Sequence, residues 1–239
     1  QATALLPSSK KHVAQLENVP YVSMPTKKTA SELRRALLRI LDELSIAHLV
    51  VDTFPTGLLG ELEQWPKGVK TTLVARIHRD AEEPSFRKAV SRFDHAIDLE
   101  PHSRWLPSPI DADPLGPVIR PPPPCDEAFP RLDLLLVASD PMLESFMRRL
   151  SQCVEGQGFR VGLVERETLF IENQRWSGFP LCLEALSPRV LVGPAGFNLT
   201  YESLSIGAWH LAIPRPKPFD DQHRRATAVA EVFSSPQAL

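Results

Sequence analysis

Short apolar runs alternate along this chain with longer segments whose apolar residues recur every three or four positions. Between residues 33 and 44, leucine and isoleucine form one stripe at helical spacing. The apolar run that follows at 48–52 has the length of a buried strand and ends in a carboxylate. The same alternation predicts strands at 2–6, 71–77 and 95–99 and a helix at 84–93.

The alternation repeats in the second half of the chain. It predicts strands at 132–138, 159–164, 189–192 and 209–213, and helices at 141–154, 179–186, 197–206 and 222–233. Strands that alternate with helices in this way are typical of βαβ units and parallel sheets. We therefore expect an α/β protein with two Rossmann-like domains whose parallel sheets face each other across a cleft. Ligands in such folds bind at the carboxyl ends of the strands.

Proline marks the boundary between the two halves. The chain has 24 prolines, and they are concentrated between residues 101 and 130, with an uninterrupted run at 121–124. Such a run is extended and semi-rigid, and it continues neither a helix nor a central strand. We interpret it as the connection between a first domain at 1–118 and a second at 119–239, although a long surface loop inside one domain is the alternative. The second half should then fold by itself from about residue 130.

Composition narrows the classes of function. The net charge is −2 and no long basic run occurs, which argues against a nucleic-acid partner. The apolar runs are too short to span a bilayer and there is no signal peptide, so we expect no transmembrane segment, while peripheral membrane association stays open. The odd number and wide spacing of the cysteines fit neither a zinc site nor a disulfide framework, which predicts a cytoplasmic protein: Cys125, Cys153 and Cys182.

The segment from 190 to 202 carries the clearest chemistry. An apolar strand leads into a Gly-Pro-Ala-Gly turn, and a helix begins near Phe197. Small residues allow a ligand to approach the backbone, and the N–H groups of a first helical turn suit a diphosphate. Glu202, about one and a half turns into the helix, is suited to accept hydrogen bonds from both ribose hydroxyls. The alternative is a tight strand-to-helix turn with a solvated glutamate.

A second motif follows the next predicted strand. Asp221 and Gln222 stand where a loop enters the helix at 222–233. A carboxylate beside an amide offers both acceptors and donors for sugar hydroxyls. The alternative is an N-cap pair that only begins the helix.

Together these motifs resemble the donor-binding half of the GT-B glycosyltransferases, above all the bacterial peptidoglycan N-acetylglucosaminyltransferases. The similar segments read Gly-Pro-Ala-Gly-x-Asn-x-x-x-Glu, Pro-Arg-Pro and Asp-Gln-x-x-x-Ala. The resemblance implies a diphosphate at the Gly-rich turn, ribose on Glu202, and the donor sugar at Asp221 and Gln222. The residues it places at the turn are Gly193, Ala195, Gly196 and Asn198.

The first half carries a weaker likeness to the same family. Residues 51–57, followed by Glu61 and Leu62, are similar to its Asp-x-Phe-Pro-x-Gly and Glu-Leu stretch. The family also has an N-terminal strand with a Gly-rich loop, often bearing a histidine, and a long C-terminal helix that the 239 residues do not include. Because the sequence opens at Gln1 rather than at a methionine, we expect that an N-terminal piece is missing.

Weaker candidates follow other strands. Asp52 is either a functional carboxylate or a loop cap, and His78 or Asp80 is a candidate base, with Arg79 as a phosphate contact, unless the loop is merely solvated. Another pair is either a nucleotide contact or a helix cap: Ser139 and Asp140. We interpret the four tryptophans as packing residues: Trp65, Trp105, Trp176 and Trp209.

The sequence therefore predicts a glycosyltransferase that moves a sugar from a nucleotide donor, with UDP as the expected nucleotide, to an unidentified acceptor. No His/Asp/Glu cluster has metal-ligand spacing, so we expect neither a metal nor a cofactor. Two alternatives remain open. One is a hydrolase or epimerase of sugar nucleotides with the same fold, and the other is a non-catalytic nucleotide-binding or partner module.

Overall fold

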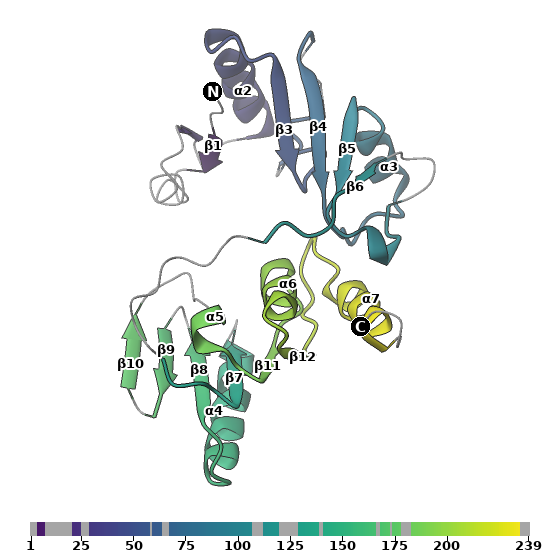
Figure 1. Cartoon of the computed structure of the whole chain (residues 1–239). Helices are drawn as coiled ribbons and strands as arrows, with labels where there is room; N and C mark the ends of the chain where they lie inside the picture. The colour runs from purple at the N-terminus through teal and green to yellow at the C-terminus, as the bar shows by residue number, and fades with distance from the viewer. Residues whose placement is uncertain are drawn as a thin grey trace. The chain divides into compact units, whose positions relative to one another are not determined.

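The chain forms two compact units (Figure 1). The computed structural model describes residues 4–7, 21–24, 29–57, 59–63, 67–106, 112–119, 129–138, 141–165, 168–172, 174–177 and 183–234. The first unit comprises Gln1–Arg76, Asp80–Asp98 and Leu106–Pro114, and the second comprises Ile77–Arg79, Leu99–Trp105 and Leu115–Leu239. Two short segments from the first half of the chain therefore belong to the second unit.

The first unit is built around a parallel sheet with the strand order β3-β4-β5-β6. These strands are β3 (His48–Asp52), β4 (Lys70–Ala75), β5 (His95–Asp98) and β6 (Asp113–Pro114). The helices described in this unit are α2 (Ala30–Glu43) and α3 (Pro84–Val90). A separate parallel pair consists of β1 (Ala4–Pro7) and β2 (Tyr21–Met24).

Helix α2 follows directly from local sequence. Thr29 and Glu32 form a capping box, in which each side chain accepts a hydrogen bond from the backbone N–H of the other residue. The apolar stripe predicted for this segment is the buried face of the helix: Leu33, Leu37, Ile40 and Leu41.

The second unit has a mixed sheet with the order β10-β9-β8-β7-β11-β12. Its parallel strands are β7 (Leu134–Ala138), β8 (Val161–Glu165), β11 (Val190–Gly193) and β12 (Trp209–Ala212). The antiparallel strands are β9 (Thr168–Ile171) and β10 (Gln174–Ser177). The helices are α4 (Pro141–Glu155), α5 (Leu183–Leu186), α6 (Phe197–Ser205) and α7 (Gln222–Ser234), with a 3-10 turn η2 (Pro101–Ser103).

The centre of this sheet is buried on both faces. Along β7, Leu135 packs into a cluster with Leu183 and Leu186 of α5. Leu136 faces the other way and packs with Leu143 and Met147 of α4. Successive strand residues point to opposite faces, so an almost continuous apolar run supplies two cores at once.

The structure also departs from the expected pattern. The β9–β10 hairpin was not predicted, so the sheet of the second unit is mixed rather than purely parallel. The helix expected at 179–186 is described only as α5, and residues 178–182 lie outside the described part of the chain, as do residues 120–128 with the proline run. The segment interpreted as a linker begins inside the second unit, which includes η2. The boundary after residue 118 stays a prediction.

Candidate functional site

The predicted diphosphate turn lies at the carboxyl end of β11, at the entry to α6. Gly193 is buried, and a Cβ built on it would lie 3.0 Å from Leu199 Cδ2 and 3.1 Å from Val137 Cβ. A side chain at this position would therefore crowd the contact between α6 and the sheet. Gly193 has a packing reason of its own, whatever ligand the turn holds.

An arginine of α7 contacts the buried side of the remaining turn residues. Ala195 is fully buried, and its carbonyl accepts a hydrogen bond of 2.9 Å from Arg225 Nη1. Gly196 is the N-cap of α6, and as a glycine it has no side chain that could cap the first N–H groups of the helix. The backbone of the turn is therefore fixed, and no side chain of Gly196 occupies the positive end of the helix.

Asn198 and Glu202 lie four residues apart on α6 and so share one face of the helix. Asn198 is exposed and Glu202 is half-buried. Their roles near a diphosphate and a ribose stay predictions.

Asp221 and Gln222 begin α7, as predicted. Asp221 Oδ1 accepts a hydrogen bond of 3.0 Å from the Arg224 N–H, so the capping function considered as the alternative is present. Gln222 is buried, and its Oε1 accepts a hydrogen bond of 2.9 Å from the Arg215 N–H. Its Nε2 lies 3.9 Å from the position that a Cβ on Gly196 would take. The structure therefore brings the Gly-rich turn and the Asp-Gln pair together.

A buried ion cluster, which sequence reasoning missed, lies under these two loops. Glu100 and Arg225 are both fully buried. Arg225 Nε lies 2.6 Å from Glu100 Oε1 and Nη2 lies 3.0 Å from Oε2, which makes a bidentate pair. Asp220 adds a second carboxylate 2.7 Å from Arg225 Nη1. The Arg225 guanidinium also lies 5.8 Å from the centre of the Phe197 ring.

Glu100 connects this cluster to two further segments. Its carboxylate accepts hydrogen bonds from the Ile77 N–H at 2.6 Å and the Tyr201 hydroxyl at 2.9 Å. The Tyr201 hydroxyl also lies 3.0 Å from His102 Nε2. Burial by itself lowers the pKa of Arg225, but the hydrogen bonds and charges of Glu100 and Asp220 outweigh it, so the pKa is raised overall. Arg225 therefore stays charged and holds α6, α7 and the Gly-rich turn in one arrangement.

The weaker candidates are distributed over both units. His78 is buried in the second unit, where it forms an isolated bridge with Asp220, and the Arg79 N–H donates to the Phe219 carbonyl at 3.0 Å. Asp80 is exposed in the first unit.

Asp52 is also an exposed residue of the first unit, and it is already paired. Its carboxylate lies 2.9 Å from Arg76 Nη2 and accepts a hydrogen bond from the Thr53 hydroxyl. The other predicted pair, Ser139 and Asp140, lies outside the described residues.

In the part of the chain that the structure describes, no helix is long and apolar enough to cross a bilayer. Among the same residues, no three His, Cys, Asp or Glu side chains are grouped as a metal site.

Comparison with known proteins gives matches only at the level of structure. No family model matches the sequence, and no curated protein matches it. The spinosyn rhamnosyltransferase SpnG in complex with thymidine diphosphate superposes with a TM-score of 0.66 at 15% identity, covering 99% of this chain and 79% of that one.

Two further solved structures superpose on this chain with similar scores. The Streptomyces sp. SF2575 glycosyltransferase SsfS6 in complex with thymidine diphosphate gives a TM-score of 0.63 at 13% identity, covering 96% of this chain and 77% of that one. MurG of Acinetobacter baumannii superposes with a TM-score of 0.60 at 11% identity, covering 97% of this chain and 75% of that one. These likenesses confirm the expected α/β fold of the GT-B type.

Proposed function

Because the chain has the fold of GT-B glycosyltransferases, we propose that it binds a nucleoside diphosphate sugar in its second unit and transfers the sugar to an acceptor hydroxyl. One observation carries the proposal. The Gly-rich turn and the N-terminus of α6 meet the start of α7 at the carboxyl ends of the parallel strands β11 and β12, next to a buried arginine. Two structures of the same fold contain thymidine diphosphate, which supports a nucleoside diphosphate as the bound group.

Each predicted residue has a function in this proposal. The diphosphate lies against the turn of Gly193, Ala195 and Gly196, with Asn198 beside it, and Glu202 accepts hydrogen bonds from the ribose. Asp221 and Gln222 face the donor sugar with the atoms that their structural hydrogen bonds leave available, Asp221 Oδ2 and Gln222 Nε2. The donor that we propose is a UDP-linked sugar.

In the proposed reaction, the oxygen of the acceptor hydroxyl attacks the anomeric carbon of the donor sugar. The bond from that carbon to the phosphate oxygen breaks, and the nucleoside diphosphate leaves. The N–H groups of α6 stabilise the leaving diphosphate without a metal ion. The acceptor proton passes to a base, for which Asp52, His78 and Asp80 are the candidates. Turnover should therefore be unchanged by EDTA.

Glu202→Ala tests the binding mode. Loss of a charge-assisted hydrogen bond to ribose should weaken UDP binding by about 1.5–3 kcal/mol, measured by calorimetry. Glu83→Ala, an exposed glutamate of the first unit, is the matched control and should bind UDP as the wild type does. Titration with CDP, which keeps both ribose hydroxyls, tests the base preference, and equal affinities of wild type and Glu202→Ala for UDP would refute the ribose assignment.

Product analysis separates transfer from its alternatives. A hydrolase would release UDP from a UDP-sugar without any acceptor, and an epimerase would change the sugar and release nothing. A binding module would bind the nucleotide and leave the donor intact. The proposal requires UDP release that depends on an added acceptor hydroxyl.

A further inference from the structure

A hollow lies in the second unit at the opposite edge of the sheet from the Gly-rich turn. It has a volume of about 490 Å³, within the size range of small-molecule sites. Its lining residues stand at the amino ends of parallel strands: Arg131 shortly before β7, Pro188 and Arg189 before β11, and Trp209 at the start of β12. Nothing in the proposed glycosyl transfer uses this edge of the sheet.

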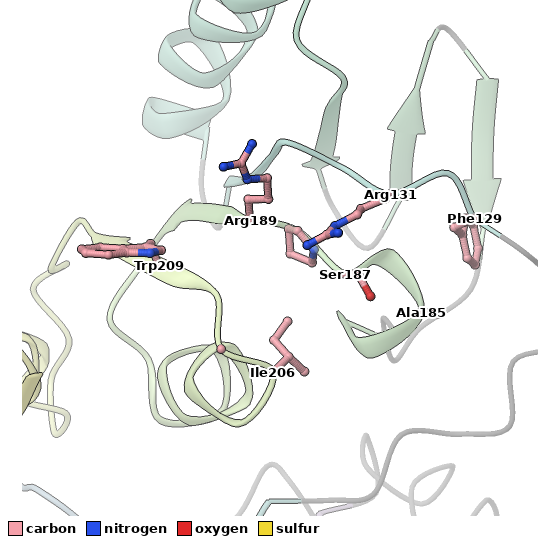
Figure 2. A pocket seen from close by; sticks show the side chains of 9 residues that line it. Phe129, Arg131, Ala185, Ser187, Arg189, Ile206 and Trp209 are labelled. Carbon is pink, nitrogen blue, oxygen red and sulfur yellow. The ribbon is translucent and has the colours of Figure 1, made fainter. Parts of the chain in front are cut away.

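The lining is positively charged. The nine described residues around the hollow include Arg131 and Arg189 and no acidic side chain. Arg189 Nη1 lies 3.9 Å from Asp133 Oδ1, and both residues line a neighbouring hollow of about 460 Å³ that shares Arg189 and Trp209 with the first. Arg131 makes no ion pair with a described carboxylate, and Figure 2 shows its side chain extending toward the middle of the group. Arg131 is therefore the cation available to a ligand here.

Part of the wall of the hollow is apolar or aromatic. Trp209 exposes 77% of its surface, which corrects the interpretation of this tryptophan as a packing residue. Phe129 and Trp209 stand at opposite ends of the hollow, with Ile206 between them (Figure 2). The space beside Gly207 is open, because a Cβ built on it would meet no atom within 4 Å. The same hollow therefore contains an exposed indole, which offers a stacking surface, and a guanidinium that pairs with no described carboxylate, which offers a charge.

We propose that this hollow binds a planar aromatic molecule that carries one anionic group, either a carboxylate or a phosphate. The ring stacks on Trp209 and the anion forms a bidentate pair with Arg131. The proposal does not depend on the glycosyltransferase function, because it concerns other residues at the other edge of the sheet.

The test uses the full chain labelled with ¹⁵N and follows the indole N–H resonances of its four tryptophans. The Trp209→Phe variant identifies the Trp209 signal. The probes are 2-naphthoate, 2-naphthyl phosphate and the uncharged 2-naphthamide. We expect a saturable shift of the Trp209 resonance with at least one of the two anions, and at least tenfold weaker binding of the amide. The same shift should persist in the presence of saturating UDP.

Arg131→Gln should weaken binding of the anion at least tenfold. Arg149→Gln is the matched control, because it removes one positive charge from an exposed position of α4 that lines neither hollow, and it should bind as the wild type does. The proposal is overturned if neither anion shifts Trp209 saturably, if the amide binds as tightly as the anions, or if the two arginine variants behave alike. A difference between 2-naphthoate and 2-naphthyl phosphate identifies which anion the site prefers.

Discussion

At the scale of single residues, the buried pair of Glu100 and Arg225 connects several segments of the second unit. Two charges out of water stabilise a fold only when their hydrogen bonds are satisfied. Glu100 receives hydrogen bonds from Arg225, Tyr201 and the Ile77 N–H, and Arg225 also reaches the Ala195 carbonyl. The pair is therefore both a structural requirement and the support of the proposed donor site.

Arg225→Met should lower the free energy of unfolding of the full chain by about 3–5 kcal/mol, because it leaves Glu100 buried without its cation. Adding Glu100→Gln to this variant should recover part of the loss, since the unpaired charge is then gone. Urea denaturation measures both effects. A loss below about 1 kcal/mol, in the range of an exposed ion pair, would contradict the buried function of the pair.

His210 supplies a prediction about pH. Burial lowers the pKa of His210, against an opposing hydrogen bond with the backbone of Gly193, and its Nε2 is buried without a partner among the described residues. The unfolded chain therefore takes up this proton at higher pH than the folded chain. Stability is present above the ordinary histidine pKa of about 6.5 and is lost as the pH falls below it.

Thermal unfolding should show this loss as a fall in Tm from about pH 7.5 to about pH 5.5. His210→Gln cannot take up the proton, so its Tm should fall less over the same interval. His223→Gln, at an exposed position of α7, should keep the wild-type dependence. An unchanged pH dependence in His210→Gln would show that another group titrates.

At the scale of elements, two glycines of the turn between β11 and α6 have different functions: we expect Gly193 to be required for packing and Gly196 for ligand binding. A Cβ on Gly193 would meet Leu199 and Val137 at 3.0–3.1 Å, whereas a Cβ on Gly196 would meet only Gln222, at 3.9 Å. Gly193→Ala should therefore cost about 1–3 kcal/mol of stability through overpacking. Gly196→Ala should cost at most about 1 kcal/mol, for the poorer N-cap, yet weaken UDP binding, because its methyl group stands where the proposed diphosphate would approach the backbone. Calorimetry and urea denaturation on both variants check this pair of outcomes.

Most elements of the described chain follow from local pattern, within one or two residues of their predicted bounds. The exceptions have physical reasons. Strands β2, β6, β9 and β10 were not predicted, and two of them carry no apolar run: β6 has two residues and β10 reads Gln-Arg-Trp-Ser. Trp209 gave no sign of exposure, because nothing in its neighbourhood predicts that β12 lies at the edge of the sheet. The Glu100–Arg225 pair joins residues 125 positions apart, and no local pattern connects them.

At the scale of the whole chain, the two units do not divide the sequence at a single point. Residues 77–79 and 99–105 follow β4 and β5 of the first unit along the chain but belong to the second unit. They bring His78, Glu100 and His102 to that unit. The expectation that the second half folds by itself from about residue 130 therefore omits a buried partner of Arg225.

This omission predicts opposite effects of one substitution in two chains. An isolated piece of residues 130–239 lacks Glu100, so Arg225 would be left with a large part of its pairing missing, and the piece should be less stable than the second unit of the full chain. Arg225→Met removes that uncompensated charge in the piece and should raise its stability. In the full chain, the same substitution leaves Glu100 buried without its cation and should lower the free energy of unfolding. Urea denaturation of both chains, with and without the substitution, measures the sign. A loss of stability in both chains would mean that Asp220 and the Ala195 carbonyl satisfy Arg225 without Glu100.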